Sequence, residues 1–171
     1  MELLELLKER YSVRNFADIP VEQEKLDKII AAGMAAPSAK NFQPVKVYVL
    51  KSEEAIQKIR SVTRCAYNAP VVFMIAVDKN KEWHNDLEEG ITSGAQDASI
   101  VCDHMMLEAA SLGLGSVWVG WFAPSKAHEA FELPENEQVV MLLPVGYAAE
   151  TSVPAPNHTK RIPREEMFKE L

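Results

Sequence analysis

The chain has 171 residues, of which 47% are apolar and 25% are charged, as expected for one globular domain over residues 1–171. Its net charge of −7 argues against a general nucleic-acid-binding surface, which must be basic. The sequence also shows no run long enough to cross a bilayer, no signal-peptide pattern and no C-x-x-C pair, so we expect a cytoplasmic protein without a disulfide framework.

Helical and extended patterns alternate along the first half of the chain. Apolar residues at helical spacing predict three helices, over residues 2–9, from Pro20 to about Gly33, and from Ser52 to about Val62. Pro20 suits a first helical position, and Ser52 suits an N-cap. Apolar runs predict strands over residues 45–50 and 71–77, and the second strand should be buried on both faces.

In the second half, a polar loop over residues 78–89 leads to a long helix over residues 93–112, which two glycines end. Its inner face should carry Ala95, Ala98, Val101, Met105, Ala109 and Leu112. Further strands are predicted over residues 116–122 and 139–145, with a helix capped by Ser125 between them. The last residues, 148–171, are rich in proline and should form an extended arm that finds contacts elsewhere, for example on another subunit. The whole pattern predicts a layered α/β or α+β domain.

Residues 10–16 place two cations and a hydroxyl at alternate positions of an acidic chain. In an extended segment, side chains two residues apart point to the same face, so Arg10, Ser12 and Arg14 should form one polar row that Phe16 continues. Two guanidinium groups and a hydroxyl can bind a phosphate or another electron-rich group. A solvated edge strand or loop is the alternative interpretation.

Two later segments have the residue types of a ring-binding site. Residues 36–44 join a helix to a strand and carry amide and hydroxyl side chains that can read the edge of a heteroaromatic ring. A helix end followed by a tight turn is the alternative. In residues 112–121, Gly120 indicates a bulge or a flat ligand against the backbone, whereas Trp118 and Trp121 are more typical of core or interface anchors.

Other features leave more than one interpretation open. The basic residues 160–164 either complete an anion site with the first segment or form a solvated tail. The loop over residues 78–89, with Trp83 and His84, either lines a site or is an exposed connection, and the second is favoured. The four histidines are isolated from other candidate ligands, so no metal site is expected.

Taken in order, six motifs resemble the nitroreductase family of flavoproteins: R-x-S-x-R-x-F, A-P-S-A-x-N-x-Q-P, N-A-P-V-V, G-L-G-S-x-W-V-G, L-P-V-G-Y and K-R-I-P-x-E-E. The resemblance covers essentially the whole chain, which looks like a short member. It implies an α+β fold with a central, mostly antiparallel sheet flanked by helices, in an intertwined homodimer. It also implies that the arm over about residues 148–171 crosses to the other subunit, and that FMN binds at the dimer interface.

The resemblance implies cofactor contacts from four segments: Arg10, Tyr11, Ser12 and Arg14; Pro37, Ser38, Asn41 and Gln43 of the partner chain; Trp118, Val119 and Gly120; and Lys160 and Arg161. The first two polar residues of the row and the terminal basic pair would bind the phosphate end. Arg14 would lie near N1 and the C2 carbonyl of the isoalloxazine, and backbone groups at 119–120 would lie near N5. Two positions depart from the family: Val45 replaces a common tryptophan, and Val119 stands where many members have glutamate.

The implied activity is that of an FMN-dependent oxidoreductase, which passes a hydride from NAD(P)H through flavin N5 to a nitroaromatic, quinone or related acceptor. No protein proton donor is identified, and Arg14 is expected to stabilise the reduced ring. A contact of about 1–3 kcal/mol would shift the two-electron potential by roughly tens of millivolts. A flavin-binding or flavin-storing protein without turnover is the alternative. A structural dimer that has lost FMN is disfavoured, because the polar row and the basic terminus are present.

Overall fold

The computed structural model describes residues 2–171. Its helices are α1 (Leu3–Glu9), α2 (Gln23–Met34), α3 (Glu53–Val62), α4 (Gly94–Ser111), α5 (Pro124–Ala130) and α6 (Arg164–Met167), with short 3-10 turns η1 (Ala39–Asn41) and η2 (Arg64–Ala66). The strands are β1 (Val45–Leu50), β2 (Val71–Asp78), β3 (Gly115–Ser116) and β4 (Glu137–Gly146).

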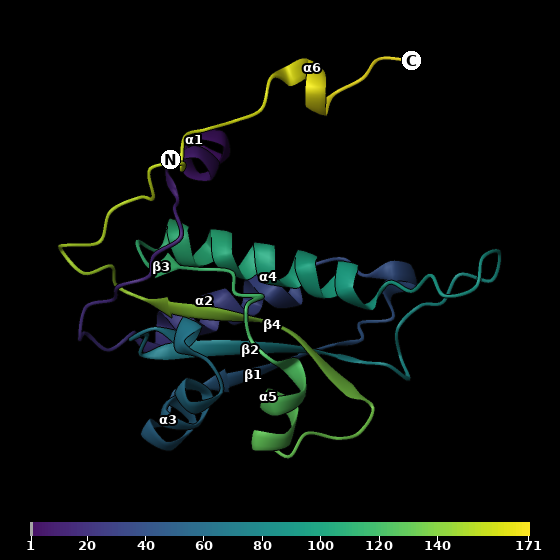
Figure 1. Ribbon diagram of the computed structural model, residues 1–171, viewed down its shortest axis with the longest axis horizontal. Helices are drawn as coiled ribbons and strands as arrows, with labels where there is room; N and C mark the ends of the chain where they lie inside the picture. The colour runs from purple at the N-terminus through teal and green to yellow at the C-terminus, as the bar shows by residue number, and fades with distance from the viewer. Residues whose placement is uncertain (1) are drawn as a thin grey trace.

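The four strands form one antiparallel sheet in the order β1-β2-β4-β3, and helices cover both of its faces. Figure 1 shows α2 and α4 on one side of the sheet and α3 and α5 on the other. Every residue of the inner strand β2 is buried. Its side chains alternate, so that Val72 and Met74 pack on the α3 side while Phe73 and Ile75 pack on the α4 side. The predicted α+β fold and the strand buried on both faces are confirmed.

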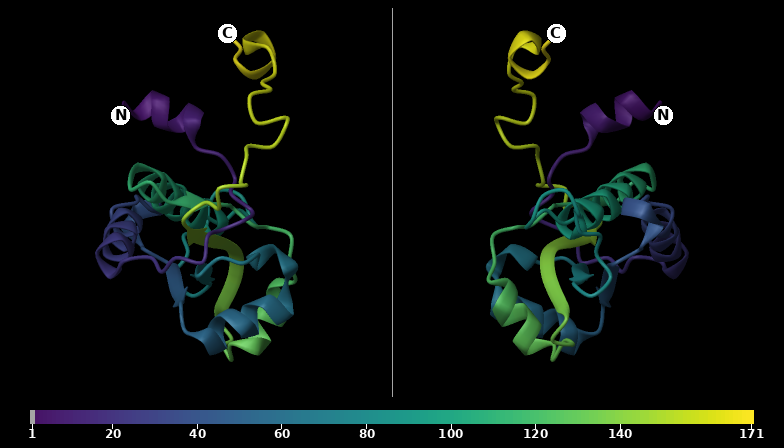
Figure 2. Two further views of the ribbon diagram at one scale, coloured as in Figure 1. Left: turned by 90° about the vertical axis from the view of Figure 1, so that its left-hand side faces the viewer. Right: turned by 90° about the vertical axis from the view of Figure 1, so that its right-hand side faces the viewer.

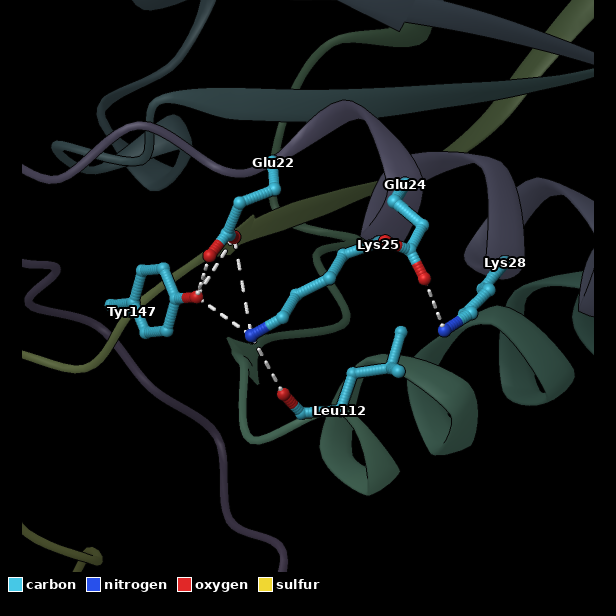
Figure 3. Close-up of polar contacts among 6 residues, drawn as sticks. All are labelled: Glu22, Glu24, Lys25, Lys28, Leu112 and Tyr147. Carbon is cyan, nitrogen blue, oxygen red and sulfur yellow. Dashed lines mark hydrogen bonds and ion pairs between the residues drawn. The ribbon is translucent and has the colours of Figure 1, made fainter.

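Helix α2 begins at Gln23 and not at Pro20, because Glu22, the residue before the helix, is extended and is held by tertiary contacts. The Tyr147 hydroxyl lies 2.8 Å from both carboxylate oxygens of Glu22. Lys25 Nζ in turn donates to the Tyr147 hydroxyl at 2.7 Å and to the Leu112 carbonyl at 3.1 Å (Figure 3). This network joins the start of α2, the end of β4 and the C-terminus of α4, where a cation is favourable for the helix dipole.

The predicted strand over residues 116–122 is wrong beyond its first residue. Within residues 115–122, only β3 forms a ladder with β4, and Val119 adds a single bridge to Leu142. The Val117 N–H donates to the Pro144 carbonyl at 3.2 Å, but a proline has no N–H with which to return the bond. The hydrogen-bond ladder therefore breaks at this point.

Two further details of the helices differ from the sequence-based expectation. Helix α5 begins with its proline and has Ala123 as the N-cap, so Ser125 is not the cap. A proline's fixed φ suits a first helical position. In α4, Ala95 is exposed, whereas Asp97 occupies an inward position and is buried.

Helix α1 and the arm after β4 project from the rest of the molecule on the side of α4 (Figures 1 and 2). Neither α1 nor α6 has a buried residue. Apolar side chains in and next to these two helices are exposed, among them Leu3, Leu4, Met167 and Phe168. Within residues 2–171, no helix combines the length and the apolar character needed to cross a membrane.

Candidate functional site

The segment over residues 10–14 lies beside the C-terminal end of α4, next to β3 (Figure 1). The Val13 N–H donates to the Ser116 carbonyl at 3.0 Å, which fixes the segment against the sheet. Val13 and Phe16 are both buried in the core, so the prediction that Phe16 continues the polar row is wrong. The segment makes single bridges rather than a ladder, and the alternation is lost after Arg14.

Arg10 carries a buried polar atom without a partner. Its Nη1 nitrogen makes no hydrogen bond to any of the described residues, and its side chain lines a cavity of about 230 Å³ together with Tyr11, Gly115 and Ser116. A buried guanidinium nitrogen without an acceptor costs on the order of 1–3 kcal/mol or more. Phosphate oxygens are among the strongest acceptors for this group. The cavity beside Arg10 therefore offers a buried donor to an anion.

Arg14 lies on the exposed side of the same segment and turns back toward it. Its Nη1 donates to the Ser12 carbonyl at 3.2 Å. Arg14 also lies near Tyr67, in the turn after η2. Burial and the neighbouring Cys65 raise the pKa of Tyr67, and the positive charge of Arg14 opposes this rise. Arg14 is thus held between two backbone segments, with its charge near the surface.

Residues 118–120 continue from β3 along β4. Val119 is buried, and its N–H donates to the Leu142 carbonyl at 2.9 Å, so its side chain points into the core and only its backbone edge faces outward. Trp118 is 38% exposed. A Cβ atom added at Gly120 would meet nothing within 4 Å, which leaves this backbone open to a flat ligand.

The C-terminal arm returns to the first segment before it projects away. The Tyr11 hydroxyl donates to the Ser152 carbonyl at 3.2 Å, and the His158 ring lies 3.2 Å from the Lys8 carbonyl. Arg161 then folds back on the arm, with Nη1 donating to the His158 carbonyl at 2.6 Å. Lys160 and Arg161 are exposed and follow these contacts closely in the chain, so the basic pair lies at the same end of the molecule as residues 10–14.

Residues 37–43 form a separate, strained turn around η1. Lys40, Asn41 and Gln43 have φ values of 49°, 56° and 51°, in the left-handed region that non-glycine residues rarely adopt. Such residues cost on the order of 1–3 kcal/mol each and cluster at functional sites. The Ser38 hydroxyl closes the turn by accepting the Gln43 N–H at 2.9 Å, and Pro37, Asn41 and Gln43 remain exposed.

A groove of about 310 Å³ adjoins this turn. Ser38 and Gln43 form its polar end, and apolar side chains from α2, β1 and α4 form the rest, including Ile30, Val47 and Met105. The polar side chains therefore lie at the edge of an apolar surface, which suits the edge of a planar aromatic ligand.

The candidate site residues fall into two groups at opposite ends of α4. Residues 10–14 and 160–161 lie toward its C-terminus, and residues 118–120 lead from there along β4 toward α5, whereas residues 37–43 lie at its N-terminus (Figure 1). An 18-residue helix is about 27 Å long at 1.5 Å per residue. One chain alone does not bring these two groups to a common ring.

Comparison with known proteins identifies the family. The model of the nitroreductase family matches residues 7–67 and 63–147, which together make up most of the chain. The chain belongs to the nitroreductase family. Among the relatives of this nitroreductase chain, a Bacillus subtilis protein named FMN reductase (NAD(P)H) is 32% identical over 181 residues, which cover 96% of this chain and 71% of the relative.

Solved nitroreductase structures share the fold. A nitroreductase family protein from Clostridium difficile 630 matches with a TM-score of 0.92 and 38% identity, over 99% of this chain and 98% of that chain. An FMN-dependent nitroreductase from Clostridium difficile R20291 matches with a TM-score of 0.79 and 28% identity, over 98% of each chain.

Two residues that support the site of this nitroreductase chain were not predicted from the sequence. Asn68 pairs with the backbone of Phe16, accepting its N–H at 2.8 Å and donating to its carbonyl at 2.6 Å. Asp97 accepts the Ala39 N–H at 3.0 Å. Asn68 stands inside the N-A-P-V-V motif, but its partner lies 52 positions away, and that of Asp97 lies 58 positions away. Only the folded chain brings these groups together.

Proposed function

We propose that this nitroreductase-family protein is an FMN-dependent oxidoreductase that uses NAD(P)H. The observation that carries the proposal is the buried Nη1 of Arg10, which has no hydrogen-bond partner among residues 2–171 and lies beside Ser12 and the exposed backbone after β3. A phosphate monoester would supply the missing acceptor. The printed names of relatives, an FMN reductase and an FMN-dependent nitroreductase, support the same ligand.

The chain's own residues divide the work of binding. Arg10 and Ser12 hold the phosphate and ribityl end, and Lys160 and Arg161 add positive charge there. Arg14 supplies a cation near N1 and the C2 carbonyl, where it stabilises negative charge on the reduced ring. When bound, FMN supplies two-electron chemistry between NAD(P)H and an acceptor such as a nitroaromatic or a quinone.

A second copy of the chain completes the site. Ser38, Asn41 and Gln43 lie at the far end of α4 from Arg10 and Arg14, so we assign them to the flavin of the partner subunit. The exposed apolar side chains of α1 and of the arm also support a second copy, since an interface between two chains would bury them. An arm that crosses to the partner subunit is the simplest way to cover the apolar side chains of α1 and those of the arm itself.

Two measurements test the proposal and separate it from flavin storage. Purified protein, or apoprotein mixed with FMN, should show the absorbance of bound flavin, and anaerobic NADH or NADPH should bleach it. Adding a nitroaromatic or quinone under the same conditions should restore the colour. Protein that binds no FMN contradicts the proposal, whereas bound flavin that neither nucleotide reduces indicates storage.

A further inference from the structure

Asp97 is a buried carboxylate at the start of α4, with 3% of its surface exposed. Its Oδ1 accepts the Ala39 N–H at 3.0 Å, and its Oδ2 accepts the Ser93 hydroxyl at 2.7 Å. Ser93 Oγ in turn accepts the Trp83 N–H at 3.2 Å. One buried side chain therefore connects the exposed turn over residues 37–43 to the first turn of α4 and to the loop that carries Trp83.

The turn that Asp97 holds cannot keep its shape through local preference. Three of its non-glycine residues have positive φ, and such backbones persist only where surrounding contacts over-determine them. The bond from Gln43 N–H to the Ser38 hydroxyl closes the turn internally. The bond from Ala39 to Asp97 anchors the turn to the rigid end of a long helix. A bond to a buried carboxylate is stronger than a neutral one.

We propose that Asp97 is the positioning residue of this turn, which it holds in the strained conformation that presents Ser38, Asn41 and Gln43 to the flavin ring. This inference rests on the proposed function, since that function assigns the turn to the flavin. Asp97 does not touch the ligand and acts through Ala39. Its effect is therefore confined to the ring side of the site and does not involve the phosphate.

Flavin affinity should fall in the order Asp, Asn, Ala at position 97. Asp97→Asn keeps an oxygen for Ala39 but replaces a charged acceptor by a neutral one, so FMN should bind about fivefold more weakly. Asp97→Ala removes the acceptor, and binding should weaken between about tenfold and a hundredfold. Riboflavin should lose the same factor as FMN in each variant. In Arg10→Ala, by contrast, FMN should lose affinity and riboflavin should not.

Ser93→Ala is the matched control, because it removes the other bond to the same carboxylate, together with the Trp83 N–H bond to Ser93, and leaves the Ala39 bond in place. Its loss of thermal stability should resemble that of Asp97→Asn, while its flavin affinity should change by less than about twofold. The inference is overturned if Asp97→Asn and Ser93→Ala weaken FMN equally, or if the ratio of FMN to riboflavin affinity changes in Asp97→Asn.

Hydrogen exchange on the apoprotein tests the same inference without flavin. In Asp97→Asn, the amides of residues 39–43 should exchange at least about fivefold faster than in the wild type, while those of β2 keep their rates. Unchanged exchange in the turn contradicts the inference even if Asp97→Ala does not fold. Wild-type protein that binds no FMN contradicts the proposed function instead, and leaves the exchange result to decide the role of Asp97.

Discussion

A dimer built from two differently altered chains tests whether each flavin site draws on both subunits. One copy carries Arg10→Ala, which removes the guanidinium whose Nη1 is buried near the C-terminal end of α4. The other copy carries Asn41→Ala and Gln43→Ala, which remove polar side chains at its N-terminal end. If a site takes one group from each chain, the mixed dimer has one site with every change and one site with none.

The expected magnitudes follow from the contacts that each change removes. A charge-assisted bond from Arg10 to phosphate is worth about 1.5–3 kcal/mol, so its loss weakens FMN between about tenfold and a hundredfold. Two neutral hydrogen bonds at Asn41 and Gln43 are together worth about 1–3 kcal/mol. In the mixed dimer these losses fall on the same site, which leaves the other site with the wild-type dissociation constant.

The assay requires two affinity tags on co-expressed chains, successive purification on both tags, removal of flavin and titration with FMN. The wild-type dimer should bind two FMN tightly, each altered homodimer none, and the mixed dimer one. If both groups of residues served a site within one chain, the mixed dimer would have two weakened sites and no tight one. That result would refute the argument from the length of α4.

Three other changes have outcomes set by the structure. Arg14→Ala should lower the two-electron flavin potential by about 20–60 mV, and an unchanged potential at full occupancy would contradict its assignment. A backbone hydrogen bond and the Tyr147 hydroxyl lower the pKa of Glu22, so its stabilisation is present above about pH 4.5 and is lost as the pH falls through the lower folded value. Urea unfolding at pH 6 and pH 3.5 should therefore show a smaller acid loss in Glu22→Gln than in the wild type. Gly115→Ala should destabilise the protein by about 1–3 kcal/mol, because its Cβ would lie 2.5 Å from a Val13 methyl carbon, whereas Gly120→Ala should leave apoprotein stability unchanged and weaken flavin binding. Equal effects of the two glycine changes on apoprotein stability would contradict this.

Elements that depend on local pattern were predictable from the sequence. Helix α3 begins after Ser52, whose side chain accepts the Ala55 N–H as an N-cap, and β2 is buried on both faces as its unbroken apolar run predicts. The motifs also indicated the four segments of the candidate site, whose role in binding flavin stays a prediction. Their chemistry is encoded in residue type and spacing, which a single sequence displays.

Features that depend on distant partners could not be predicted in the same way. The start of α2 depends on Tyr147, and the end of β3 depends on a proline in the opposite strand. Asp97 was not among the inner-face residues predicted for the long helix, because its partner Ala39 lies far away in the sequence. The same limit applies to Phe16, which the alternation of residues 10–16 placed on the wrong side.

Three unfavourable features of the single chain have a common explanation in the proposed site. The buried Arg10 Nη1 has no acceptor in the part of the chain that the structure describes, the turn at residues 40–43 is strained, and apolar side chains of α1 and the arm are exposed. A bound flavin would give the Arg10 nitrogen an acceptor and would use the polar side chains that the strained turn presents. Because it would lie between two chains, it would also favour burial of the exposed apolar side chains. Because binding free energies are reciprocal, any factor by which pairing of chains strengthens FMN binding must equal the factor by which FMN strengthens the pairing. The cofactor is then part of the interface, and the loss of either Arg10 or Asp97 would weaken the dimer through the flavin that both residues support.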